Sequence, residues 1–201
     1  KKTGIAVLFN TGNGISVNKI RSITEDREGN IILGTTGEGV EVFSSERFIS
    51  FSKRDGLIDN QVSSVCKDKN GRVWFGTNEG ISIYDPQAKP GAQYKNLTTE
   101  QGLPSPNIRS IVSDRTGNMW IATWGGRVTR FDISANRISP VAALNDIVNT
   151  LAGTLMVDSK NRLWIGTNEG IVVYDLGNGH IQTLRTIDGM VSNDITAIFE
   201  D

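Results

Sequence analysis

The chain is built from a repeated unit, and this constrains its fold more than any other feature of the sequence. The segment RVWFGTNEGISIYD at 72–85 returns as RLWIGTNEGIVVYD at 162–175, with ten of the fourteen residues identical. Two further copies, NIILGTTGEGVEVFS and NMWIATWGGRVTRFD, begin at 30 and 118, so the four copies start 42, 46 and 44 residues apart. The fold is therefore expected to use one structural unit at least four times.

Each unit has the pattern of a four-stranded antiparallel sheet. Runs such as VWFGT and ISIYD are rich in β-branched and aromatic residues and flank a Gly-containing loop, which is typical of a β-hairpin. A turn of the form Asp-x-x-Gly precedes the hairpin, and Asn161 replaces its Gly in the fourth copy. Asn is the residue that best tolerates positive φ after Gly. With a strand on either side of this block and no helical periodicity, we predict an all-β protein, a β-propeller of four-stranded antiparallel blades.

The repeat also sets the expected blade boundaries. We predict complete blades at 19–53, 61–98, 107–141 and 151–185. Residues 1–18 align with the outer strand of a preceding blade and its loop, and residues 194–201 align with the first strand of a following blade. Four blades and two orphan strands close poorly into a ring, so we expect the chain to be part of a larger propeller of about six to eight blades.

Side-chain size along the repeat agrees with this assignment. Equivalent positions of the first strand, beside the expected central channel, hold small residues: Ser22, Ser64, Ser110, Thr154 and Ala197. Equivalent positions of the second strand, between neighbouring blades, hold Ile32, Trp74, Trp120 and Trp164. A buried Trp removes roughly 200 Å² from water, so we interpret these Trp residues as packing between blades.

Composition and missing motifs exclude several functions. A net charge of −1 gives no field that attracts nucleic acid or an anionic membrane, and neither is expected as a partner. The single Cys66 lies within a strand pattern and is interpreted as a small buried hydrophobe. No nucleophile motif occurs, so we expect no catalytic residue, metal or cofactor in this segment. The Asp residues at the turns are interpreted as turn caps rather than calcium ligands: Asp26, Asp68, Asp114 and Asp158.

The complete unit resembles the two-component regulator propeller repeat. GLIDNQVSSVCKDKNGRVWFGTNEGISIYD at 56–85 carries nearly all of that family's pattern, and the resemblance covers almost the whole chain. It implies the extracytoplasmic sensor region of a hybrid two-component histidine kinase, as is typical of Bacteroidetes. It also implies a periplasmic location, an oligosaccharide ligand, signalling to the transcription of polysaccharide-use genes, and a homodimer in which further blades complete the propeller.

Positions that depart from the repeat indicate where a ligand would bind. The loops between second and third strands share one face with the loops between blades, and functional residues usually lie on such loops. Trp124 replaces Asn78 and Asn168 at the loop tip, where an aromatic ring can stack on a sugar or pack on a neighbouring loop. Arg127 interrupts the same motif and can bind an acidic sugar or pair with a solvent-facing carboxylate. The predicted ligand-binding residues are Trp124, Arg127, Asn78, Glu79, Asn168 and Glu169, with turn chemistry as the alternative for the two Glu residues.

Two other functions stay open. Streptogramin lyase is a propeller with a related blade, but that class uses a central His and a metal, whereas the single His180 lies in an expected outer strand. A protein-interaction scaffold would instead use a broad surface and would not respond to a small ligand.

Overall fold

The strands form four separate sheets, each made of four strands that follow one another in sequence. The computed structural model describes residues 8–12, 14–16, 19–26, 28–44, 47–145 and 152–201. Within every sheet each strand pairs antiparallel with the next one along the chain. The predicted fold class, a partial β-propeller of four-stranded antiparallel blades, is confirmed.

The strands of the four sheets are as follows. The first sheet contains β1 (Ile20–Glu25), β2 (Ile31–Thr35), β3 (Val40–Ser44) and β4 (Arg47–Phe51). The second contains β5 (Val62–Lys67), β6 (Val73–Thr77), β7 (Ile81–Tyr84) and β8 (Tyr94–Leu97). The third contains β9 (Ile108–Ser113), β10 (Met119–Thr123), β11 (Val128–Asp132) and β12 (Arg137–Pro140). The fourth contains β13 (Thr154–Val157), β14 (Arg162–Thr167), β15 (Gly170–Asp175) and β16 (Ile181–Leu184).

A short helical turn follows each sheet. Three 3₁₀ turns (Lys53–Asp55, Thr99–Gln101 and Thr186–Asp188) and the four-residue helix α1 (Ala142–Asn145) each follow the last strand of a sheet. Among the described residues, no helix has the length and hydropathy needed to span a membrane.

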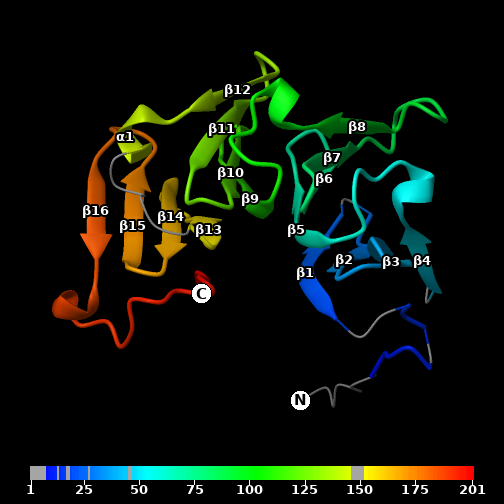
Figure 1. The fold of residues 1–201 in the computed structure, drawn as a ribbon, viewed down its shortest axis with the longest axis horizontal. Helices are drawn as coiled ribbons and strands as arrows, with labels where there is room; N and C mark the ends of the chain where they lie inside the picture. The colour runs from blue at the N-terminus through cyan, green and yellow to red at the C-terminus, as the bar shows by residue number, and fades with distance from the viewer. Residues whose placement is uncertain (1–7, 13, 17–18, 27, 45–46, 146–151) are drawn as a thin grey trace.

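The four sheets follow one another around an arc (Figure 1). The first strand of each sheet lies on the inner side of the arc, and β5 contacts both β1 and β9, while β13 contacts β9. Neighbouring blades pack closely here: a Cβ added to Gly76 of β6 would lie 2.6 Å from Cγ2 of Ile108 in β9 of the next blade. Hydrogen bonds join the inner strands, since the Ile111 N–H donates to Ser64 Oγ at 2.9 Å and the Leu155 N–H donates to Ser110 Oγ at 3.1 Å. The small residues predicted beside the channel therefore allow close contact between blades.

The C-terminal run 194–201 corrects one prediction. It forms no regular strand, although its Ile195 N–H donates to Thr167 O at 2.9 Å and its Ile195 side chain lies against Gly166, as Ile108 lies against Gly76. The run has the position of a next inner strand, but no second strand among the described residues pairs with it. A strand needs such a neighbour to form its ladder of hydrogen bonds.

The outer strand predicted at 1–18 lies largely outside the described residues. Residues 8–12 and 14–16 are described, and they contain no strand. The Phe9 ring packs against Phe43 and Phe48 of the first sheet, with centroid separations of 5.2 Å and 5.1 Å.

Large apolar side chains are buried between blades rather than within them. Trp74 is fully buried and makes an edge contact with Phe131 of the next sheet, at 5.0 Å between ring centroids. Trp120 makes the same contact with Tyr174 of the sheet after that, at 6.0 Å. A single blade cannot bury such a ring, so each blade needs its neighbour.

In the second, third and fourth blades, the turn Asp accepts a hydrogen bond from the Trp of its own blade. In the second blade, Asp68 Oδ1 accepts the backbone N–H groups of Asn70 and Arg72, and Asp68 Oδ2 accepts Trp74 Nε1–H at 3.0 Å. The equivalent indole bonds in the third and fourth blades are 2.9 Å and 2.8 Å long. The third residue after the turn Asp has positive φ whether it is Gly or Asn: φ is 85° at Gly71 and 59° at Asn161. The turn-cap interpretation of these Asp residues thus accounts for their contacts.

The substitution Trp74→Phe tests this link between turn and core. It removes the indole N–H from the buried Asp68 carboxylate and leaves a small cavity, so we expect the free energy of unfolding to fall by about 1–3 kcal/mol. Urea denaturation followed by circular dichroism measures this change. Trp124→Phe, at an exposed ring, is the control and is expected to change stability by less than about 0.5 kcal/mol; equal effects of the two would contradict the link.

The fourth turn makes stability depend on pH. Burial alone would raise the pKa of Asp158, but hydrogen bonds from the Arg162 backbone and side chain, Trp164 Nε1 and the Lys160 N–H lower it to about 2. A carboxyl with a lowered pKa stabilises the fold above its unfolded pKa, near 4, and this contribution is lost as the pH falls toward 2. Melting temperature should therefore drop between about pH 4 and pH 2, and Asp158→Asn should show a shallower drop. Parallel curves for the two proteins would refute the assignment.

Candidate functional site

Two arginines lie on the inner side of the arc. The second position of each inner-strand motif holds Arg21 in β1, Ser63 in β5, Arg109 in β9, Gly153 just before β13, and Thr196 in the C-terminal run. The two guanidinium groups are therefore presented by the first and third blades toward the same central space.

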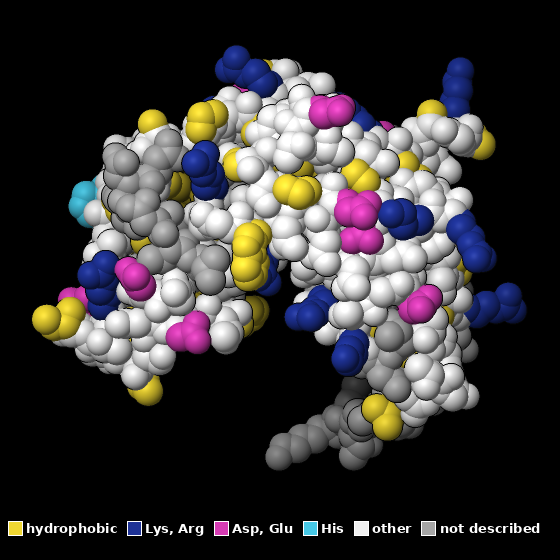
Figure 2. All heavy atoms as spheres, in the orientation of Figure 1, with side chains coloured by type: hydrophobic (Ala, Val, Ile, Leu, Met, Phe, Trp, Pro, Cys, Tyr) yellow, Lys and Arg dark blue, Asp and Glu magenta, His cyan; other side chains and the backbone are white. Residues whose placement is uncertain are grey.

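A pocket of about 400 Å³ lies at this place. Its lining includes Arg21, Arg109, Trp124, Asn168, Asp194 and Thr196. A second pocket of about 120 Å³ shares both arginines and adds Asn78 and Asn107. We call these two adjoining pockets the channel mouth. Figure 2 shows the molecular surface hollowed between the sheet β13–β16 and the sheet β1–β4, with basic side chains beside β1.

Trp124 is held at the channel mouth by its neighbours. The Arg109 guanidinium carbon lies 4.1 Å from the centroid of the Trp124 ring, which is a cation–π contact. The Trp124 N–H also donates to Asn107 O at 2.8 Å, so the backbone of the loop tip is fixed. Trp124 is still 51% exposed, and part of its ring is available for a ligand.

The lining of the channel mouth holds two arginines, Arg21 and Arg109, against one carboxylate, Asp194, and this excess of positive charge favours an anion. Partial burial, with a further contribution from the positive charge of Arg21, holds the pKa of the Arg109 guanidinium below its ordinary value. Among the described residues no carboxylate forms an ion pair with either arginine, and Arg21 Nε donates instead to Thr36 Oγ1 at 3.1 Å. Two neighbouring cations without a carboxylate partner repel each other, and a bound anion would relieve that repulsion.

Three of the predicted residues lie at the channel mouth. Trp124 and Asn168 line the larger pocket, and Asn78 lines the smaller one, where its Oδ1 accepts Asn107 Nδ2–H at 3.0 Å. These side chains come from the loops after β10, β14 and β6. The amides add donors and acceptors of the kind that sugar hydroxyls use.

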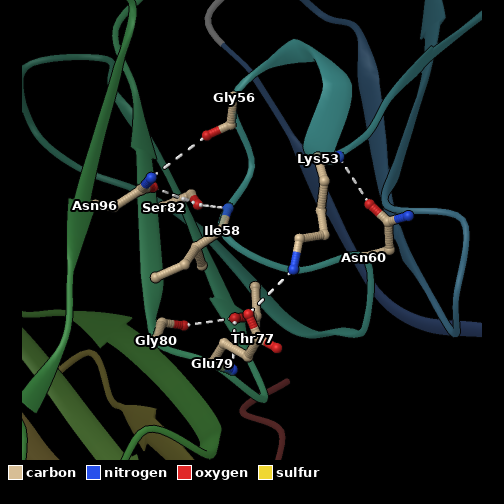
Figure 3. A network of polar contacts seen from close by, with 9 residues as sticks. All are labelled: Lys53, Gly56, Ile58, Asn60, Thr77, Glu79, Gly80, Ser82 and Asn96. Atoms are coloured by element: carbon tan, nitrogen blue, oxygen red, sulfur yellow. Dashed lines mark hydrogen bonds and ion pairs between the residues drawn. The ribbon is translucent and has the colours of Figure 1, made fainter.

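The other three predicted residues lie outside these linings. Glu79 forms an ion pair with Lys53 at 3.1 Å (Figure 3). Glu169 lines a separate hollow of about 20 Å³ that also includes Arg185. Arg127 has an exposed side chain, and its backbone carbonyl accepts the Thr123 N–H at 3.0 Å.

Figure 3 shows the polar contacts that give Glu79 a structural role in its loop. The Glu79 N–H donates to Thr77 Oγ1, and Thr77 Oγ1 in turn donates to Gly80 O at 2.8 Å, which closes the hairpin loop. Beside it, the Ile58 N–H donates to Ser82 Oγ at 2.9 Å and connects the inter-blade loop to β7. These contacts support the turn-chemistry alternative for Glu79.

Three segments of the chain match a family of propeller repeats. Residues 14–37, 56–79 and 102–125 match the family model described as "Two component regulator propeller". A comparison with curated proteins found no match.

Solved structures share the fold at low sequence identity. The extracellular domain of a protein of B. thetaiotaomicron assigned as a hybrid two component system aligns with TM-score 0.73 and 22% identity, over 86% of this chain and 24% of that one. The extracellular domain of a protein of the same organism assigned as a one component system gives 0.74 and 19%, over 89% and 26%. Virginiamycin B lyase from Staphylococcus aureus gives 0.65 and 17%, over 83% and 55%. The chain thus spans about a quarter of the first of these structures, and the likeness establishes a propeller fold.

The repulsion between the two arginines is testable by salt. Arg21→Gln removes one of the two charges, so at low ionic strength it should raise the free energy of unfolding by about 0.2–0.5 kcal/mol. The difference from the wild type should vanish near 1 M salt, because the Debye length is then about 3 Å. Chemical denaturation with urea at several NaCl concentrations measures both values. Arg127→Gln is the matched control, and an equal salt dependence in that variant would contradict the assignment.

Proposed function

We propose, from the premise that these are two-component regulator propeller repeats, that the chain is part of a ligand-sensing extracytoplasmic propeller. The parent protein would be a hybrid two-component sensor histidine kinase and response regulator, located in the inner membrane with this region in the periplasm. Its ligand would be an oligosaccharide, and its output would be transcription of genes for polysaccharide use. The support is the family of the repeats together with the extracellular domains that share the fold.

The channel mouth is the observation that carries the proposal. An exposed Trp124 ring offers a flat apolar face of the kind that packs on a sugar ring. Arg21 and Arg109 lie beside it and can each form paired hydrogen bonds with a carboxylate or sulfate. Together with the amides of Asn78 and Asn168, this set of groups fits an acidic oligosaccharide better than a neutral one.

Ligand binding at this place would connect several blades. The lining groups come from β1, from β9, from the loops after β10 and β14, and from the run 194–196. A ligand that contacts all of them stabilises one relative arrangement of these blades. In a homodimeric receptor, we infer that this arrangement changes the packing of the two subunits and so the kinase state.

A lyase function has less support. His180 precedes the outermost strand β16 and is exposed, so it lies away from the central pocket where that class of enzyme uses a His. The likeness to virginiamycin B lyase concerns the fold.

The proposal is tested by calorimetric titration of the 201-residue chain with uronic-acid oligosaccharides and with neutral oligosaccharides of equal length. We expect the acidic series to bind more tightly. Trp124→Ala should weaken binding roughly tenfold, as expected for the loss of about 1.4 kcal/mol of stacking.

Glu169→Gln is the matched control, at a loop tip outside the channel mouth, and should leave the affinity unchanged. Unchanged affinity in Trp124→Ala would refute the stacking role. Binding of no oligosaccharide, combined with stable capture of a protein partner, would favour the scaffold alternative.

A further inference from the structure

The first blade lacks the Trp that the other three blades share. In the second blade Trp74 of β6 pairs across the sheet with Cys66 and Ile83. The equivalent position in the first blade is Ile32 of β2, which pairs with Thr24 and Val42. The space between the first and second blades therefore receives a smaller side chain than the spaces that follow.

The aromatic wall on the other side of that space is retained. Tyr84 of β7 is the equivalent of Phe131 and Tyr174, the rings that contact Trp74 and Trp120. Here Tyr84 packs instead against Phe51 at 6.0 Å and Tyr94 at 5.1 Å between ring centroids.

The hydrogen-bond acceptor for an indole is also retained. In the other three blades Oδ2 of the turn Asp accepts an indole N–H. In the first blade, Oδ2 of Asp26 accepts Asn30 Nδ2–H at 2.8 Å. Asp26 and Asn30 lie at the edge of a pocket, and the Asn30 amide is the only side-chain donor bonded to that oxygen among the described residues.

The pocket itself has a volume of about 380 Å³, which is in the range of small-molecule sites. It lies between the first and second sheets, and its lining includes Ile32, Val42, Phe51, Tyr84, Tyr94 and Asp26. The Asp turns join first and second strands, whereas the loop tips of the channel mouth join second and third strands. The pocket and the channel mouth are therefore at opposite edges of the sheets.

We propose that this inter-blade pocket binds a small molecule with a planar aromatic ring and an N–H donor, of the indole class. The ring takes the place between blades that Trp74 and Trp120 fill in their own blades, against Tyr84. The ring N–H is directed to the Asp26 carboxylate, as the other three indoles are directed to their turn Asp. This inference does not depend on the oligosaccharide site.

Free indole is the probe for the test, with thermal melting and calorimetry on the 201-residue chain. We expect a saturable rise in melting temperature and a dissociation constant of about 1 mM or lower. 1-Methylindole, which has the same shape but no N–H, should bind at least about fivefold more weakly.

The matched variant is Ile32→Trp, which supplies the missing indole from the chain itself. It should melt at a higher temperature than the wild type and lose its response to indole. Val42→Phe, which narrows the same pocket from β3, gives a second route if Ile32→Trp fails to fold. Both variants should keep the far-UV circular dichroism spectrum of the wild type, which separates loss of this pocket from loss of the fold.

Three results would overturn the proposal. The first is a wild-type melting temperature that does not respond to indole. The second is indole binding of equal strength in the variants that fill the pocket. The third is equal binding of indole and 1-methylindole, which would remove the role of Asp26.

Discussion

The hydrogen bond from the Trp indole to the turn Asp holds the fold together at two levels. Asp68 is only 3% exposed, and its carboxylate is satisfied by the turn N–H groups, by Arg72 and by the indole of Trp74. A buried carboxylate without such partners would be costly, so the turn and the Trp orientation depend on each other. The same Trp packs against Phe131 of the next blade. One side chain thereby connects the local turn to the contact between blades.

The sequence predicts this much of the fold because the interaction is local and repeated. Asp68 and Trp74 are six residues apart, and the positive φ of Asn161 follows from the same turn. The repeat predicts a strand at 194–201, but the run forms none, because no second strand among the described residues pairs with it. The 3₁₀ turns were missed, although they have a local signal. Lys53–Asp55 begins after Ser52, whose hydroxyl and N–H both donate to Asp55, and it ends at Gly56 with φ of 118°.

The candidate site was predictable in part for the same reason. Trp124 departs from a repeated loop, so the comparison of copies identifies it. Arg21 and Arg109 lie in strands where polar and apolar residues alternate. An Arg that faces solvent on any exposed strand gives the same pattern, so the sequence does not single these two out. Only the curvature of the blade arrangement makes these two positions converge. The ion pair of Glu79 joins it to Lys53, 26 residues earlier, and no local pattern contains that pairing.

The residues that depart from the repeat are of different kinds, and the contacts that each one makes distinguish these kinds. Glu41 is fully buried, and its carboxylate accepts hydrogen bonds from the Ser16 N–H at 2.9 Å and the Ser50 hydroxyl at 3.0 Å. The buried Glu is therefore accompanied by the partners that it needs. Thr129 is the equivalent residue in the third blade, and its hydroxyl has no partner among the described residues. In the second blade, the equivalent Ser82 accepts the N–H of Ile58. The loop position of Ile58 is occupied by Pro104 in the third blade. A proline has no N–H to give. Such changes concern the packing of an inter-blade loop.

Trp124 differs because it adds a large apolar surface and leaves half of it in solvent, where this surface contributes no burial to the stability of the fold. This exposed aromatic surface is the physical reason why we propose a ligand site at the channel mouth.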